Sequence, residues 1–78
     1  MRIKVTQQDI DAGTRRSCLG CPIALALGRM VPGVSVGQGQ IIWVADGEYH
    51  ERDTPSAVRR FISSFDDGYP VEPVVFDI

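Results

Sequence analysis

The dipeptide Asp46-Gly47 constrains the fold more than any other feature of this chain, because it separates two runs that are typical of β-strands. A two-residue type I′ turn needs a positive φ at both central positions, and aspartate followed by glycine tolerates this. The flanking runs, residues 41–44 and 49–52, are therefore predicted to form an antiparallel hairpin whose register is fixed by the turn.

That register places Trp43 opposite His50, with Arg52 on the same face of the hairpin. An aromatic ring beside a cation can bind a partner protein, so these three residues are the predicted partner-binding residues. The alternative is that Trp43 is buried as the largest residue of the core. One face of the hairpin should pack on helices, and the other, which carries Trp43 or Tyr49, should be half exposed.

A helix is predicted after the hairpin, with Thr54 as its N-cap and Pro55 at its first position. Its buried stripe repeats at the i, i+3, i+4, i+7 spacing. The residues of this stripe are Val58, Phe61, Ile62 and Phe65.

An earlier helix is predicted over residues 22–30, ended by Pro32 and Gly33. Its buried stripe contains Ile23, Ala26, Leu27 and Met30. Leu25 lies off this stripe, which indicates that a second face of the helix is covered by the sheet edge or by another subunit.

Alternating residues predict an opening strand at 2–5 and a closing strand at 74–78. A hydrophobic content of 44% with 23% charged residues is typical of a folded chain, and 78 residues allow one domain, residues 1–78. The expected class is α+β, a small antiparallel sheet with two helices on one face. A ferredoxin-like βαββαβ order is one arrangement that fits, and a plain β-meander with two helices is the other.

The only two cysteines, Cys18 and Cys21, precede Pro22 at the start of the earlier helix. Proline favours the first helical position, so Cys21 is predicted at or beside the N-cap. Packing and capping are the favoured roles of the pair. Redox chemistry and metal binding stay open as alternatives, although a structural zinc site needs four ligands and His50 is the one other soft ligand.

A second candidate is a binding site for a small anion at the same helix start. Arg15, Arg16, Ser17 and Cys21 form the predicted ligand-binding set, because guanidinium groups and free helical N–H groups attract phosphate or carboxylate. The alternative is an ordinary solvated loop.

Several functional classes are disfavoured by the sequence. No paired carboxylates, nucleophile–base pair or glycine-rich phosphate loop can be assembled, so we predict no enzyme, no catalytic residue, no cofactor and no metal ligand. The net charge of −2 argues against general nucleic-acid binding. No run is long enough to span a membrane and no signal peptide is evident, so the cytoplasm is the expected location, with both thiols reduced.

Three motifs spread along the chain are similar to motifs of a known group of proteins. They are VTQQDI at residues 5–10, CxxCPIALA at 18–26 and FIxxFDxGxPVEP at 61–73. Together they resemble small uncharacterised proteins encoded by bacteriophages and prophages. The resemblance implies a phage context and a bacterial host cell, and it brings no established activity or site residue.

The function expected from these observations is non-enzymatic binding. The first hypothesis is a protein that acts stoichiometrically on a host factor, such as a component of host defence. The second is an oligomer, a homodimer or larger, that sequesters an anionic nucleotide-like ligand. A thiol-redox or zinc-binding module is the third.

Overall fold

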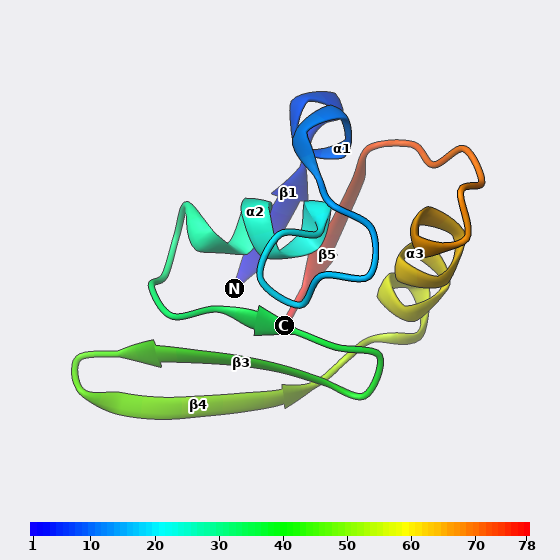
Figure 1. Ribbon diagram of the computed structural model, residues 1–78. Coiled ribbons are helices and arrows are strands. Elements are labelled where there is room, and N and C mark those ends of the chain that lie inside the picture. The colour runs from blue at the N-terminus through cyan, green and yellow to red at the C-terminus, as the bar shows by residue number, and fades with distance from the viewer.

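The computed structural model describes residues 1–78, and it contains three α-helices and five β-strands (Figure 1). In chain order these are β1 (Arg2–Val5), α1 (Gln7–Ala12), α2 (Pro22–Gly28), β2 (Ser35–Val36), β3 (Gln40–Ala45), β4 (Glu48–Asp53), α3 (Ser56–Asp66) and β5 (Val74–Asp77). The fold is α+β, as the sequence predicts.

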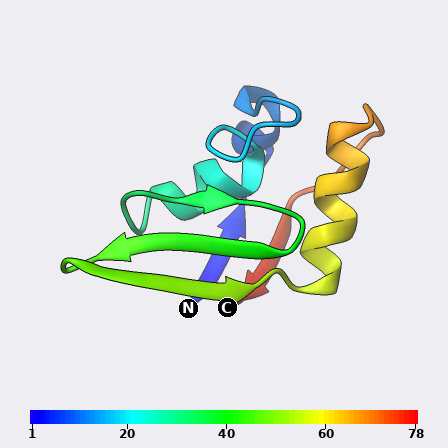
Figure 2. The same cartoon turned by 60° about the horizontal axis from the view of Figure 1, so that its bottom comes forward.

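The strands form two antiparallel sheets. β1 pairs with β5, and β2, β3 and β4 form a three-stranded meander. The first pair brings the chain ends together, because the Met1 amino group donates to the Ile78 carbonyl oxygen over 2.7 Å. Figure 2 shows the two termini side by side and the β1–β5 pair running across the three-stranded sheet.

A single ferredoxin-like sheet with two helices on one face is therefore not the arrangement found. The physical reason lies at β2, which has two residues and whose outer edge is occupied by a loop. The Val36 N–H donates to the Cys18 carbonyl oxygen over 2.8 Å, so β2 has no free edge there for β1. The three-stranded part matches the meander alternative.

The predicted hairpin register is confirmed. Trp43 pairs with His50 and Val44 pairs with Tyr49. Asp46 and Gly47 have φ angles of 54° and 76°, which are the positive values that the type I′ turn requires.

Helix α2 begins as predicted but ends earlier. Cys21 is its N-cap, and its sulfur accepts a hydrogen bond from the Ala24 N–H over 3.4 Å. The Met30 N–H bonds to the Leu27 carbonyl oxygen three residues back, so the chain tightens and Met30 turns outward, 53% exposed. The prediction that Met30 belongs to the buried stripe was wrong.

Helix α3 buries the predicted stripe of Val58, Phe61, Ile62 and Phe65. Its predicted cap was wrong, because Pro55 occupies the N-cap position and makes no side-chain cap. The Thr54 hydroxyl instead donates to the Gly37 carbonyl oxygen over 2.8 Å and ties the helix entry to the turn after β2. The Gly37 carbonyl is part-buried and needs a donor, and Thr54 supplies it.

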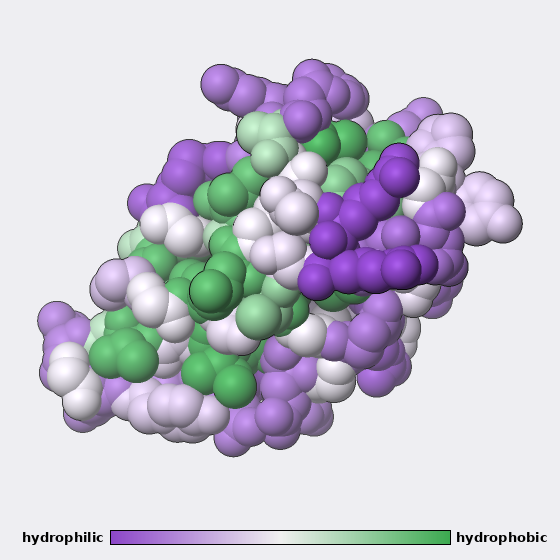
Figure 3. Space-filling model, in the orientation of Figure 1, coloured by the Kyte–Doolittle hydropathy of each residue, from purple (hydrophilic) through white to green (hydrophobic).

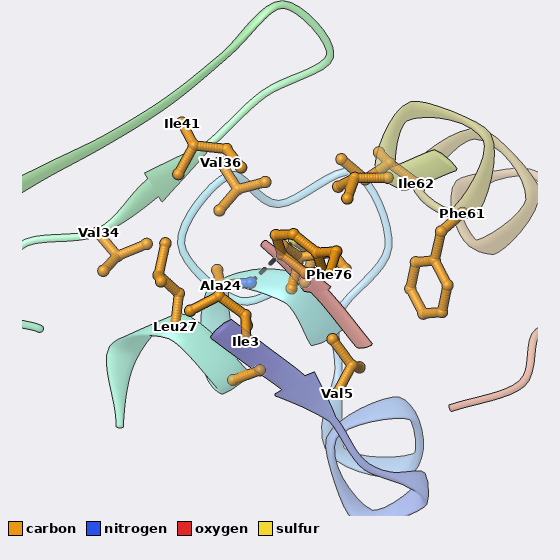
Figure 4. Close-up of a cluster of buried hydrophobic side chains, with 14 of the residues drawn as sticks. Ile3, Val5, Ala24, Leu27, Val34, Val36, Ile41, Phe61, Ile62 and Phe76 are labelled. Atoms are coloured by element: carbon orange, nitrogen blue, oxygen red, sulfur yellow. Dashed lines mark hydrogen bonds between the residues drawn. The ribbon is translucent and has the colours of Figure 1, made fainter. Parts of the chain in front are cut away.

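The core lies between the two sheets and the helices α2 and α3. Figure 4 shows side chains from β1, α2, β2, β3, α3 and β5 pointing toward one another. The most deeply buried members are Ile3, Val5, Ile23, Leu27, Ile41 and Val58. These residues come from β1, α2, β3 and α3, so the core joins the two sheets into one unit.

Candidate functional site

The structure brings the predicted partner-binding residues together but covers their centre. Trp43 is only 7% exposed and belongs to the core. The His50 ring stacks on it, with centroids 5.3 Å apart and planes 11° apart. The Arg52 guanidinium lies 5.4 Å from the centroid of the indole. His50 and Arg52 therefore shield the indole from solvent, which matches the buried alternative for Trp43.

The opposite face of the hairpin is the open one. Val44 is 42% exposed, and its cross-strand neighbour Tyr49 is 63% exposed. Ile42 lies half-buried on the same face, opposite the exposed Glu51. Successive side chains of a strand point to opposite faces, so the face that turns away from Trp43 combines apolar residues with carboxylates.

An apolar groove of about 390 Å³ lies beside this face. Its apolar lining is Leu19, Ala24, Leu25, Val31 and Val34. Figure 3 shows hydrophobic side chains gathered over α2 and the segment that leads into β2. Leu19 is 69% exposed, which is unusual for a leucine next to other apolar side chains.

Leu25 forms part of the apolar lining of this groove. The sequence indicated a second apolar face on the earlier helix, and the structure places Leu25 half-buried in the groove. Leu19 and Val31 were not singled out from the sequence, because each stands in an irregular segment without a periodic pattern.

The groove and the hairpin face meet at Gly33. The Val44 N–H donates to the Pro32 carbonyl oxygen over 3.3 Å, which ties β3 to the segment that leads into β2. A Cβ added to Gly33 would lie 3.6 Å from the Val44 Cβ. Val44 therefore lies next to the end of the groove.

The predicted ligand-binding residues only partly converge. Arg16, Ser17 and Cys21 line a hollow of about 220 Å³, together with Cys18, Gln38 and Asp66. Arg15 is not among its lining residues. Its guanidinium packs over Gly68 instead, 3.4 Å from where a Cβ would stand.

The charges in this hollow do not suit an anion. The Arg16 N–H already donates to a carboxylate oxygen of Asp66 over 2.8 Å. Burial raises the pKa of the Cys21 thiol, and the nearby Asp66 charge raises it further. A neutral thiol and a carboxylate therefore share this hollow with Arg16, and the carboxylate offsets the positive charge that a bound phosphate would need.

Cys18 and Cys21 are both free thiols, Cys18 exposed and Cys21 buried. No group of three or more His, Cys, Asp or Glu side chains is placed to hold a metal ion. None of the helices has the length and apolar character that crossing a membrane requires.

The arrangement as a whole is that of a small fold with a buried tryptophan, an apolar groove at α2 and an exposed hairpin face beside it. Comparison with protein-family models, curated proteins and solved structures finds no match to this chain.

Proposed function

We propose that this protein is a small, non-enzymatic, phage-encoded binding protein that acts stoichiometrically on a host protein in the bacterial cytoplasm, with counter-defence as its role. The observation that carries the binding function is the apolar surface formed by Leu19, Leu25, Val31, Val44 and Tyr49, which we call the groove surface. The phage context rests on the resemblance of the three sequence motifs.

The groove surface has the composition of an interaction site. A small domain gains stability by burying apolar side chains, so leaving Leu19, Val44 and Tyr49 exposed is a cost that binding offsets. Burying one such side chain against a partner contributes about 1.5–3 kcal/mol. Tyrosine is also enriched among the residues that dominate binding energy.

The charged residues at the edge of the groove surface, which we call its rim, indicate which kind of partner would fit it. Glu51 faces Ile42 across the hairpin, and Asp53 follows two residues later on the same face. Both carboxylates are exposed, and neither is in a salt bridge. A partner segment with apolar side chains and flanking Lys or Arg would therefore fit both the centre and the rim.

Capture experiments with matched variants test this proposal. Leu19→Asp places a charge in the groove and should weaken binding at least tenfold, because even about 1.4 kcal/mol produces that change. Glu51→Lys should weaken it by reversing the rim charge. Tyr69→Asp is the control, since Tyr69 is 67% exposed and lies in the connection before β5, outside the groove surface.

The proposal predicts one host protein captured in a 1:1 ratio by the parent chain and by Tyr69→Asp, and lost from Leu19→Asp. Equal capture by all variants contradicts it. A parent chain that sediments as a dimer, and that Leu19→Asp converts to a monomer, would also contradict it, because a second copy would then occupy the groove.

A further inference from the structure

Strand β4 forms a free edge of the three-stranded sheet. It stands at the end of the order β2-β3-β4 and pairs only with β3. Every residue of β4 is exposed except His50, which is half-buried. The other edge of this sheet is occupied, because Val36 of β2 bonds to the Cys18 carbonyl oxygen. An exposed edge strand presents unpaired N–H and C=O groups that another strand can bind.

Tyr49 and Glu51 carry the unpaired backbone groups of this edge. The Thr54 N–H, just beyond β4, donates to the Gly39 carbonyl oxygen over 3.0 Å and so points toward the β3 side. Hydrogen-bonding directions alternate along an antiparallel strand. The N–H and C=O groups of His50 therefore point toward β3, and those of Tyr49 and Glu51 point away from it.

We propose that β4 pairs with β4 of a second copy of this chain, antiparallel and centred on His50. Tyr49 of each copy then lies opposite Glu51 of the other, and their outward N–H and C=O groups bond to each other. Glu48 of each copy lies opposite Arg52 of the other. Opposite charges directly across two strands stabilise the pair.

The charges of β4 favour this register. Charged side chains commonly keep edge strands apart, so their arrangement decides whether two copies can pair. Centring the pair on Glu51 would place Glu51 opposite its own copy, and centring it on Arg52 would place Arg52 opposite its own copy, and like charges directly opposite are destabilising. With His50 at the centre, each Glu48 has an Arg52 opposite it.

The two charged side chains are available for this pairing. Neither Glu48 nor Arg52 is in a salt bridge within the chain. Arg52 Nη1 instead donates to the Glu51 carbonyl oxygen over 2.9 Å, which is one of the outward groups of the edge. A strand from the second copy would take over that carbonyl oxygen and release the guanidinium for Glu48.

Sedimentation equilibrium of the full chain and its charge variants tests this pairing. The parent should sediment with twice the mass of the chain. Glu48→Arg and Arg52→Glu should each raise the dimer dissociation constant about tenfold, because like charges replace both attractive pairs. The double variant Glu48→Arg/Arg52→Glu restores opposite charges and should recover the dimer. Arg60→Glu is the matched control, since it makes the same change of charge at an exposed position of α3 and should leave the dimer unchanged.

Amide hydrogen exchange gives a second readout. The N–H groups of Tyr49 and Glu51 should exchange slowly in the parent and faster in Arg52→Glu. Leu19→Asp alters the groove surface and should stay dimeric, so this pairing stands apart from the proposed function. A parent that is monomeric at millimolar concentration overturns the proposal, as does a double variant that dissociates like the single variants. Fast exchange of Tyr49 and Glu51 in a dimer, or a dimer that Leu19→Asp dissociates, also overturns it.

Discussion

The carboxylate of Asp9 and the guanidinium of Arg29 join helix α1 to the residue that ends α2. Arg29 Nη2 donates to Asp9 Oδ2 over 2.8 Å, and Nη1 donates to the other carboxylate oxygen. The same Asp9 carboxylate accepts the Thr6 backbone N–H over 2.9 Å and completes the capping box of α1. The bonds from Arg29 and Thr6 lower the pKa of Asp9 to about 2 from an ordinary value of 3.8.

This pKa predicts an acid-dependent loss of stability. Because the folded pKa lies below the unfolded one, the contribution is fully present well above pH 4 and disappears as the pH falls toward 2. The loss should be about 2 kcal/mol in the free energy of unfolding. Denaturant unfolding of the parent and of Asp9→Asn between pH 2 and pH 7 measures it. Asp11→Asn, on the exposed side of the same helix, should keep the parent's acid response, and a similar response in Asp9→Asn would refute the assignment.

The hydroxyl of Thr54 should matter because it binds the turn after β2 and not because it caps α3. Thr54→Val leaves the Gly37 carbonyl without its donor and should lower the free energy of unfolding by about 1–3 kcal/mol. Thr54→Ser keeps the hydroxyl and should recover most of that loss. Chemical denaturation compares the three proteins. A Thr54→Val protein as stable as the parent would show that this hydrogen bond contributes nothing.

Phe61 should be a main support of the core. It is 8% exposed and lies beside Phe65, with ring centroids 6.4 Å apart. Phe61→Ala should cost about 3–5 kcal/mol, a large share of the stability of so small a domain. The exposed neighbour Arg60 provides the control, since Arg60→Ala should change stability by less than about 0.5 kcal/mol. Thermal unfolding decides, and a Phe61→Ala protein that melts within a few degrees of the parent would contradict the core assignment.

Much of the local structure could be predicted from the sequence because short-range physics determines it. The Asp46-Gly47 turn, the capping box at Thr6 and the N-cap at Cys21 depend on residues only a few positions apart. The buried stripe of α3 follows from helical periodicity alone.

The features that sequence reasoning missed depend on long-range contacts. The role of Thr54 is set by the Gly37 carbonyl, 17 positions away. The outer edge of β2 is occupied by a hydrogen bond between Val36 and Cys18, 18 positions away. The backbone N–H of Arg16 is bound by Asp66, 50 positions away. None of these contacts leaves a periodic or motif signal in the chain.

The candidate site also combines local features that could be predicted with long-range features that could not. The pairing of Trp43 with His50 was predicted, but which hairpin face packs on the core depends on how the meander meets α2 and the β1–β5 pair. Leu25 gave a partial signal as an apolar residue off the main stripe. The exposure of Leu19 could be found only from the fold.

Site-specific photo-crosslinking tests the central claim most directly. A photoreactive amino acid is placed at Leu19 or Val44 on the groove surface, or at Tyr69 as the control, and the protein is irradiated in bacterial cells. We predict one adduct from Leu19 and Val44, with the mass of one copy of this chain plus one host protein, and none from Tyr69. An adduct formed equally from Tyr69, or one with the mass of two copies of this chain, would contradict the proposal that the groove surface binds a host protein.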